Sequence, residues 1–295
     1  MKIGITVGDP AGIGPEIIVA ALESGKLPRE IDYHVIGATN RFAPGKPERA
    51  SAKHAFRVLE EAVLLARAGE VHAIVTGPVC KKAMHEAGFA FPGQTEFFAE
   101  RCEVSDFAMC LTGGKITVAL VTAHVPLASV SQLLRPSEIV RVGRLLANFL
   151  VCRGIDRPRI AVAGLNPHAG ESGDLGSEEI LIIAPAVESL RLFLSGKAEV
   201  SGPHSPDTLF QRVTAGDFDG VLCMYHDQGL IPLKLHAFHE GVNVTLGLPF
   251  PRTSPDHGTA FEIAGKGIAR PDSMISAIRL AYELAGRGAP GKTHS

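Results

Sequence analysis

The chain lacks the features that mark membrane proteins, disulfide-rich secreted proteins and nucleic-acid-binding proteins. No stretch reaches the roughly 18 apolar residues of a membrane-spanning helix. A net charge of -2 gives no overall field that would attract nucleic acid. The five cysteines include no Cys-x-x-Cys pair, which argues against a disulfide framework or a zinc ribbon. No secretory signal is recognisable, so we expect a cytoplasmic protein with neither membrane nor nucleic acid as a partner.

No Gly-x-Gly-x-x-Gly stretch follows a predicted strand and opens a helix, which is where this dinucleotide-binding fingerprint is expected. In its place, the glycine-rich stretch Gly8–Glu16 follows a predicted strand and opens a predicted helix. Glycines permit left-handed backbone and close approach, and a helix N-terminus favours anions, so the stretch suits an anion site. It equally suits a tight turn, and the sequence leaves both interpretations open.

Strand-length apolar runs alternate with helical patterns along the chain. The predicted strands are Ile3–Val7, Ala73–Thr76, Ile116–Thr122, Arg159–Ala163, Gly220–Met224 and Val242–Leu246. The predicted helices are Pro15–Leu22, Ala50–Ala66, Pro136–Leu150, Ser177–Leu194, Ser205–Ala215 and Ser273–Ala285. Such alternation indicates βαβ units and hence an α/β fold with mostly parallel sheet. The segment that holds Lys234, His236 and His239 is compatible with a solvated hairpin.

Three histidines each follow a predicted strand: His124, His168 and His226. The carboxyl ends of parallel strands open on one side of a sheet, where ligands bind, so these imidazoles can converge without being close in sequence. Three imidazoles suit Zn²⁺, Co²⁺, Ni²⁺ or Fe²⁺ better than bare Mg²⁺. Each histidine taken alone has the simpler interpretation of a structural residue.

Two further stretches carry polar or small residues suited to ligands. Lys234, Asn243 and Arg252 together form a plausible clamp for a carboxylate or a phosphate. The run Pro255–Ala269 is rich in small residues and suggests backbone wrapped around a flat ligand, or else a glycine-rich crossover. Asp207 stands at a predicted helix start, where it can simply cap the helix.

Several stretches, in order along the whole chain, resemble the 4-hydroxythreonine-4-phosphate dehydrogenase family of vitamin B6 biosynthesis. The matching stretches are GDPAGIGPE, TGPVCKKAMHEAGF, PGQTEFFA, TAHVPL, GLNPHAGESGDLGSEE, PDTLF, MYHDQGLIPLK and GVNVTLGLPFPRTSPDHGTAFEIAGKG. The last of these also looks like the adenosine-binding loop of the isopropylmalate and isocitrate dehydrogenases. The resemblance implies their two-domain α/β fold, with an active site in the interdomain cleft. We expect residues 1–106 with 255–295 in the first domain, and residues 107–254 in a second that carries metal ligands and dimer contacts.

The resemblance also assigns expected roles to individual residues. The metal ligands fall on His124, His168 and His226, with one Zn, Co or Mg ion, in a homodimer whose subunits share the active site. Acidic or basic residues that line the pocket, and are candidates for catalysis, fall on Lys234, Asp207 and Asp227. Substrate contacts fall on Gln94, Thr95, Lys234, Asn243 and Arg252. NAD or NADP is expected along His257, Gly258, Thr259 and Ala260, with Glu262 facing the ribose hydroxyls.

Two departures from the family pattern bear on the substrate. Gln94 stands where the family usually has histidine; glutamine can bind an oxyanion but cannot titrate. The chain is also shorter than is typical around Ala38–Ala50. Both put the substrate in question more than the reaction.

The expected reaction is oxidation of 4-phosphooxy-L-threonine to a β-keto acid that decarboxylates to 3-amino-2-oxopropyl phosphate. A divalent metal would lower the pKa of the substrate hydroxyl, and the base would be Lys234, Asp207 or a metal-bound water. One alternative is a paralogue that acts on D-threonate or D-erythronate 4-phosphate, or on a cyclic diol carboxylate. A second is a protein that binds metal and phosphorylated metabolites without catalysis.

Overall fold

The computed structural model describes residues 1–38 and 42–287 and divides into two compact units. The first contains residues 1–105 and 239–295, and the second contains residues 106–238. The chain therefore returns to the first unit earlier than the expected 254/255 boundary. The reason is strand β9 (Val242–Leu246), which pairs antiparallel with β10 (Arg252–Pro255) and so belongs with it.

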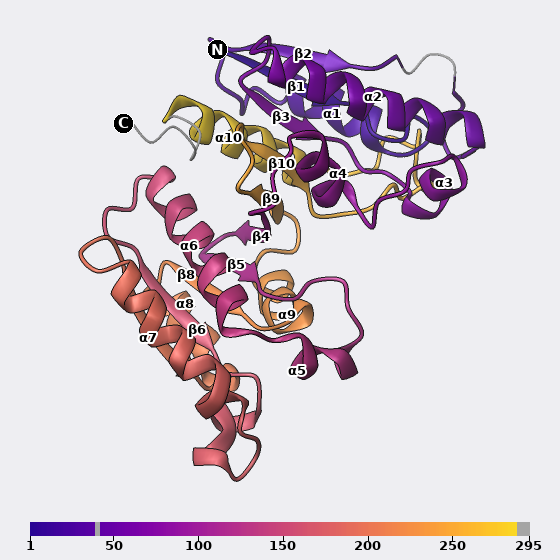
Figure 1. Cartoon of the computed structure of the whole chain (residues 1–295). Coiled ribbons are helices and arrows are strands. Elements are labelled where there is room, and N and C mark those ends of the chain that lie inside the picture. Colours follow the sequence, from indigo (N-terminus) through magenta and orange to yellow (C-terminus); the bar gives the residue numbers. More distant parts are fainter. Residues whose placement is uncertain (39–41, 288–295) are drawn as a thin grey trace. The chain divides into compact units, whose positions relative to one another are not determined.

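The first unit is a mostly parallel sheet with helices packed on it (Figure 1). Its strands have the order β2-β1-β3-β10-β9, and the β9–β10 pair is antiparallel. The remaining strands are β1 (Lys2–Thr6), β2 (Asp32–Ile36) and β3 (Ala73–Thr76). The helices are α1 (Gly14–Glu23), α2 (Arg49–Arg67), α3 (Lys81–Glu86), α4 (Gln94–Arg101) and α10 (Asp272–Gly286).

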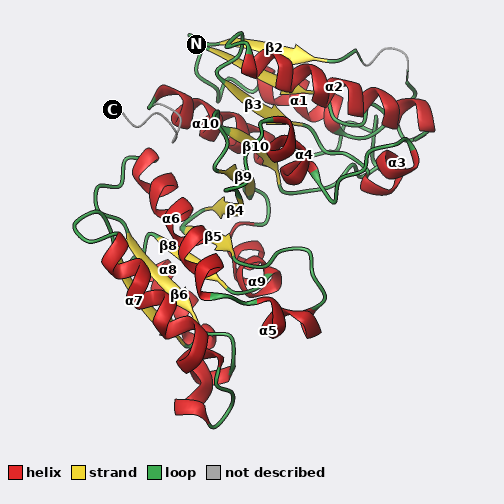
Figure 2. Ribbon diagram, viewed as in Figure 1, coloured by secondary structure: helices red, strands yellow, loops and turns green. Residues whose placement is uncertain are grey.

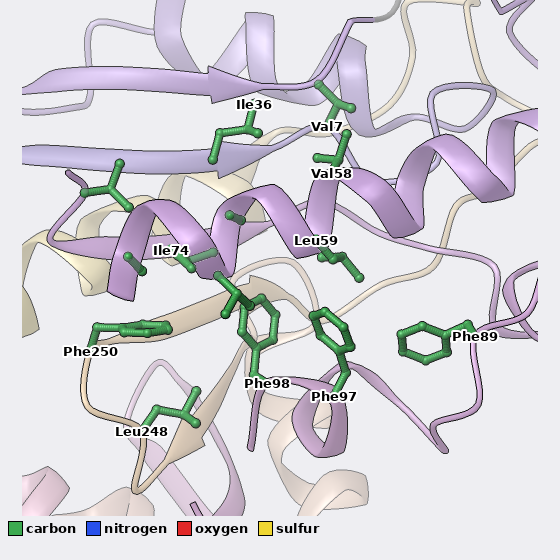
Figure 3. Packing of buried hydrophobic residues seen from close by; sticks show 14 of the residues in the cluster. Val7, Ile36, Val58, Leu59, Ile74, Phe89, Phe97, Phe98, Leu248 and Phe250 are labelled. Carbon is green, nitrogen blue, oxygen red and sulfur yellow. The ribbon is translucent and has the colours of Figure 1, made fainter. Parts of the chain in front are cut away.

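The core of the first unit forms around helix α2, whose apolar residues recur at helical spacing. Helix α2 buries Ala55, Val58, Leu59 and Ala62 at the spacing of one helical face. This face meets Ile74 of β3 and the aromatic rings of Phe89, Phe97 and Phe98, as Figure 3 shows. The close packing fixes α4, whose first residues are Gln94 and Thr95.

The second unit is built in the same way, with helices beside a mostly parallel sheet (Figure 2). Its strand order is β4-β5-β8-β6-β7, and only the β4–β5 pair of these described strands is antiparallel. The strands are β4 (Ala108–Gly113), β5 (Ile116–Leu120), β6 (Arg159–Ala163), β7 (Glu199–His204) and β8 (Gly220–Cys223). The helices are α5 (Val130–Leu133), α6 (Pro136–Cys152), α7 (Ala184–Phe193), α8 (Pro206–Ala215) and α9 (His226–Ala237). A short turn of 3₁₀ helix occupies Leu127–Ser129, a left-handed turn lies within Pro167–Gly173, and a π-helical turn over Glu179–Ile183 leads into α7.

Alternation along the strands sends side chains to both faces of the second sheet. Val118 of β5 and Val221 of β8 pack in one core cluster with Leu209 of α8 and Leu233 of α9. Within each strand, the residues next to Val118 and Val221 point to the opposite face, because side chains alternate along a strand. The central strands β5, β8 and β6 are thus buried on both sides, which explains their nearly continuous apolar sequences.

The α/β prediction is confirmed, and each predicted strand and helix is present with small shifts of its ends. Strands β2, β4, β7 and β10 had not been predicted. The hairpin interpretation of Lys234, His236 and His239 is wrong, because the first two lie in helix α9 and His239 follows it. The shortened Ala38–Ala50 stretch falls partly outside the described residues, since 39–41 are not among them. Within residues 1–38 and 42–287, no helix combines the length and apolarity needed to cross a membrane.

Candidate active site

The three histidines follow strands that are neighbours in the second sheet. Strand β8 lies between β5 and β6 and runs parallel to both, so the carboxyl ends of all three share one edge. His124 comes four residues after β5, His168 five residues after β6, and His226 begins helix α9 after β8. The sheet thus supplies the placement expected from the sequence.

Hydrogen bonds between the loops bring two of these histidines together. The amide and the hydroxyl of Thr122 both donate to the carbonyl of Met224, at 3.2 and 2.7 Å. Each of these residues is two positions before a histidine, and the rings of His124 and His226 have centroids 5.7 Å apart. They line a hollow of about 290 Å³ together with apolar residues, Tyr225 and Asp227.

His168 is not grouped with the other two histidines within the chain. Across the described ranges, no set of three or more His, Cys, Asp or Glu side chains is arranged to hold a metal ion. The His168 side chain is 63% exposed, whereas that of His226 is 31% exposed. One chain therefore offers a histidine pair and a separate, solvent-facing third histidine.

A carboxylate accompanies each of two histidines at the same ring nitrogen. Nδ1 of His226 lies 2.7 Å from Asp227 Oδ1, and Nδ1 of His168 lies 2.8 Å from Glu171 Oε2. A carboxylate at Nδ1 favours the tautomer that protonates this nitrogen, which leaves the lone pair of Nε2 for a ligand. Carboxylate–imidazole pairs of this kind are common around metal ions in proteins.

The segment that carries His168 has an unusual backbone. Five consecutive residues, His168 to Ser172, have φ between 44° and 81°, and only Gly170 among them is glycine. Left-handed conformation costs a residue with a side chain about 1–2 kcal/mol. Such strain persists only where the surroundings hold it, and it often marks a functional segment.

The Glu179 carboxylate stabilises the start of this segment through hydrogen bonds. Its Oε1 accepts hydrogen bonds from the amides of Leu165 and Asn166, both at 2.7 Å, and its Oε2 accepts one from Asn166 Nδ2 at 2.9 Å. Burial by itself would raise the pKa of this carboxyl. The hydrogen bonds from Asn166 and Leu165 outweigh burial and lower the pKa, so Glu179 is ionised at neutral pH.

Two further candidates in the second unit have environments that separate their roles. Asp207 lies in the first turn of α8, and the Ser205 hydroxyl donates to it at 2.5 Å, which lowers the pKa of its carboxyl. The lowered pKa makes the Asp207 carboxylate a weaker base. Its contacts are those of a residue that stabilises the start of a helix. Lys234 is half-buried in α9, with Nζ 5.7 Å from the centre of the Phe238 ring.

In the first unit, Arg252 is the centre of a buried polar group. The residue is 2% exposed, and its Nη atoms donate to Thr245 Oγ1 at 3.2 Å, Thr76 Oγ1 at 2.5 Å and Gln94 Oε1 at 3.0 Å. All three acceptors are neutral, while Nε is buried without a hydrogen-bond partner. Burial lowers the pKa of the guanidinium and the charge of Glu96 opposes this. The lowered pKa, about 9, still lies above neutral pH, so the group stays charged.

The sheet register explains why the other predicted contacts lie near Arg252. Arg252 faces Thr245 across the β9–β10 ladder, and Asn243 is two residues along on the same face. The Oδ1 atom of Asn243 is buried and without a hydrogen-bond partner. Thr95 joins the group through its hydroxyl, 3.2 Å from that of Thr245. A buried cation whose hydrogen-bond acceptors are neutral, with unused polar atoms nearby, is suited to an anionic ligand.

The expected nucleotide loop packs on the glycine-rich turn near the start of the chain. The amide of Ile13 donates to the Thr259 carbonyl at 2.9 Å, and a Cβ on Gly12 would come 2.8 Å from the same oxygen. Gly8 has φ 70°, and a Cβ there would collide with the Pro78 carbonyl. The amides of Asp9, Ala11, Gly12 and Ile13 all donate within the protein. These bonds favour the tight-turn interpretation of Gly8–Glu16 over an anion site.

The loop itself exposes several of the residues expected at the nucleotide. Gly258 and Glu262 are exposed, His257 and Ala260 are partly exposed, and Thr259 is buried. Ala260 has φ 41°, in the left-handed region, and open space surrounds the position of a Cβ on Gly258. The exposed Glu262 carboxylate suits hydroxyl donors.

The structure adds four polar residues that had no role assigned from the sequence: Glu171, Glu179, Thr76 and Thr245. A signal existed for Glu171, whose three-residue spacing from His168 suits a local pair. Thr76 and Thr245 meet Arg252 only through the order of the strands. No local pattern connects Glu179 with Asn166, because 13 residues separate them.

The fold is shared with the β-decarboxylating dehydrogenases. The structure of one from Thermococcus kodakarensis has a TM-score of 0.57 at 16% identity and covers 97% of this chain and 83% of that chain, a likeness of fold alone. The family model "Pyridoxal phosphate biosynthetic protein PdxA" matches residues 16–281, and the chain belongs to this family.

Relatives in this family are named as dehydrogenases. The 4-hydroxythreonine-4-phosphate dehydrogenase of Maricaulis maris is 41% identical and aligns with 96% of this chain and 97% of its own. The D-threonate 4-phosphate dehydrogenase of Pectobacterium atrosepticum is 42% identical, over 96% and 99% of the two chains. The crystal structure of 4-hydroxythreonine-4-phosphate dehydrogenase from Klebsiella pneumoniae has a TM-score of 0.81 at 40% identity, and covers 96% of this chain and 99% of that chain.

Proposed function

We propose that the protein catalyses the NAD(P)-dependent, metal-dependent oxidation of 4-phosphooxy-L-threonine. The β-keto acid formed would decarboxylate to 3-amino-2-oxopropyl phosphate, a step in the synthesis of pyridoxine 5'-phosphate. Family membership and relatives named for this activity support the proposal. The structural observation that carries it is the buried Arg252 guanidinium, with neutral acceptors around it.

Arg252 and its neighbours are proposed to bind the anionic part of the substrate. An oxyanion beside the guanidinium would supply the charge that the three neutral acceptors do not. Asn243 and Thr95 are placed to add hydrogen bonds, and Lys234 is proposed to donate a further hydrogen bond to the substrate. A charge-assisted hydrogen bond is worth about 1.5–3 kcal/mol, so this group contributes strongly to affinity.

His124, His168 and His226 are proposed to hold one divalent ion, Zn²⁺, Co²⁺ or Mg²⁺. The donor set fits such an ion, because two imidazoles lie side by side and two of the three have Nδ1 held by a carboxylate. When bound, the ion supplies Lewis acidity that favours loss of a substrate hydroxyl proton. Asp227 and Glu171 orient the imidazoles. Lys234 is the candidate to take the proton, because the contacts of Asp207 make that carboxylate a weaker base.

NAD or NADP is proposed to bind along His257–Glu262 and to accept the hydride. Thr259 anchors this loop to the glycine-rich turn, while the exposed Glu262 carboxylate is available to ribose hydroxyls. The nucleotide therefore does not need a Gly-x-Gly-x-x-Gly turn.

A homodimer is proposed in which a second copy completes the metal site. Support comes from the separation of His168 from the histidine pair within one chain. Leu175, Ile180 and Leu181, near the His168 segment, are 48–68% exposed, and Leu127, close to His124, is 70% exposed. Exposed apolar side chains gathered beside functional residues are typical of protein interfaces.

A paralogous activity on D-threonate or D-erythronate 4-phosphate is the main alternative. Gln94 favours it, because the family usually has histidine at this position, and one relative is named for D-threonate 4-phosphate. The Arg252 group fits a phosphorylated acid better than a cyclic diol carboxylate. The remaining alternative is a protein that binds the metal and phosphorylated acids without oxidising them.

The test is a screen for NADH or NADPH formation with each phosphorylated acid and with a cyclic diol carboxylate. Each would be assayed with added Zn²⁺, Co²⁺ or Mg²⁺ and after treatment with a chelator. We expect turnover of 4-phosphooxy-L-threonine that is lost with the chelator and returns with metal. Faster turnover of a threonate phosphate would favour the paralogue. Metal binding without turnover of any compound would favour the non-catalytic alternative.

A further inference from the structure

The carboxylate of Glu179 is hydrogen-bonded to the residues that precede His168. Glu179 is only 3% exposed, although it lies in the π-helical turn at the start of α7, beside exposed Ile180 and Leu181. Its three hydrogen bonds come from Leu165 and Asn166, the residues just before Pro167 and His168. The buried charge is therefore satisfied by the His168 segment itself.

The left-handed turn closes over this carboxylate. A Cβ on Gly170 would come 2.7 Å from Glu179 Oε2 and 3.1 Å from the Gly176 carbonyl, so a side chain there would displace the carboxylate. A Cβ on Gly176 would collide with the side-chain amide of Asn166, which also donates to Glu178 Oε2 at 2.8 Å. The turn is thus wrapped around the Glu179–Asn166 pair on more than one side, and its course depends on both groups.

We propose that Glu179 is a positioning residue that sets where His168 Nε2 stands toward a divalent ion. It acts through the amides of Leu165 and Asn166 and does not itself touch the ion. The inference rests on the proposed function, in which His168 is a metal ligand. Residues that orient a ligand typically alter metal affinity by about 10–100-fold when they are changed.

The substitution Glu179→Gln changes the charge and the hydrogen bonding of the side chain but keeps nearly the same volume. The glutamine amide has one oxygen and one NH₂ group, so it cannot accept from all three donors that the carboxylate serves. At least one donor, from Leu165 or Asn166, would face another donor, and the left-handed turn would lose a fixed point. The side-chain volume stays nearly the same, so the α7 packing is retained.

The experiment is a Co²⁺ titration of the full-length protein, followed by visible absorption, for wild type, Glu179→Gln and Glu188→Gln. Glu188 is the matched control, because it is an exposed glutamate of α7 that pairs with Arg191 at 2.6 Å. We expect Glu179→Gln to raise the Co²⁺ dissociation constant by about 10–100-fold and to change the Co²⁺ spectrum. Glu188→Gln should match wild type, and the KM for NAD, measured at saturating Co²⁺, should be unchanged in both.

His168→Ala separates failure of this inference from failure of the proposed function. If His168→Ala binds Co²⁺ like wild type, the proposed metal site is wrong. If His168→Ala loses Co²⁺ while Glu179→Gln keeps wild-type affinity and spectrum, the positioning role is overturned, even where the melting temperature falls. Should Glu179→Gln not fold, Asn166→Ala removes the side-chain hydrogen bonds to Glu179 Oε2 and Glu178 Oε2 but keeps both amide donors to Glu179 Oε1, and the same comparison decides.

Discussion

Gln94 accepts a hydrogen bond of 3.0 Å from the guanidinium of Arg252 through its amide oxygen. Because glutamine is neutral, the positive charge of Arg252 remains available to an anionic ligand. Replacing Gln94 with glutamate would put a carboxylate at this distance and satisfy the cation internally. We expect Gln94→Glu to raise the KM for a phosphorylated substrate by roughly tenfold to a hundredfold, measured by NADH formation.

Gln94→Ala is the control for this effect, because it removes the acceptor without adding charge. Its KM should rise less than that of Gln94→Glu, since Arg252 keeps its bonds to Thr76 and Thr245. Equal KM values for Gln94→Glu and wild type would show that the charge of Arg252 does not act on the substrate.

Removal of Arg252 itself tests the anion site directly. Arg252→Ala should raise the KM for the phosphorylated acid about tenfold or more, because a charge-assisted contact worth about 1.5–3 kcal/mol is lost. Arg270→Ala, a matched change at an arginine that pairs with Asp272 on the surface, should have little effect. Circular dichroism would check that both variants fold, and an unchanged KM in folded Arg252→Ala would remove Arg252 from the site.

Asp227 was a candidate for catalysis, and its contact with His226 Nδ1 predicts a different role. Asp227→Asn should weaken metal binding by about 10–100-fold, because the imidazole loses the carboxylate that fixes its tautomer. Metal content after gel filtration, measured by mass spectrometry, gives the readout, and excess metal should restore part of the turnover. Full metal content with turnover that stays low would instead indicate that Asp227 moves a proton.

A shared metal site predicts that two inactive variants can complement one another. In the proposed dimer, His168 of one subunit joins His124 and His226 of the other. A dimer of one His168→Ala subunit with one His226→Ala subunit then has one intact site. Random mixing should recover about a quarter of wild-type activity, because about half of the dimers are mixed and each has one working site. Refolding the two variants together and separately gives the comparison; no recovery in a verified mixed dimer would place all three ligands in one subunit.

Much of this arrangement could be predicted from the sequence because its causes are local. The strand runs before His124, His168 and His226 are apolar on both sides of the sheet, and parallel strands share one edge. Arg252 and Asn243 were expected near one another from the family resemblance, and the β9–β10 ladder explains why.

What could not be predicted depends on contacts distant in sequence. Strand β10 is only four residues long and begins with an arginine, so no apolar run marks it. Helix α9 contains Pro232 and lacks a strongly one-sided apolar pattern, which favoured the wrong hairpin interpretation. Two of the neutral hydrogen-bond acceptors of Arg252 are Thr76 and Gln94, which are 176 and 158 residues away in sequence.

The lowered pKa of Glu179 predicts how its contribution to stability depends on pH. Its folded-state pKa lies below the ordinary value near 4.5. The ionised carboxylate therefore stabilises the fold fully above that ordinary value, and the contribution is lost as the pH falls through the lower, folded-state value. Wild type should unfold at a higher temperature than Glu179→Gln near neutral pH, because an unsatisfied buried donor costs about 1–3 kcal/mol.

The difference in melting temperature should be constant between about pH 6 and 8 and should shrink on acidification below about pH 4.5, where the carboxyl takes up its proton. Differential scanning calorimetry with a chelator present would measure it without any contribution from metal binding. Glu188→Gln should stay close to wild type throughout, since exposed ion pairs contribute about 0–1 kcal/mol. A difference between wild type and Glu179→Gln that persisted unchanged at acid pH would mean that the ionised carboxylate is not what holds the His168 segment.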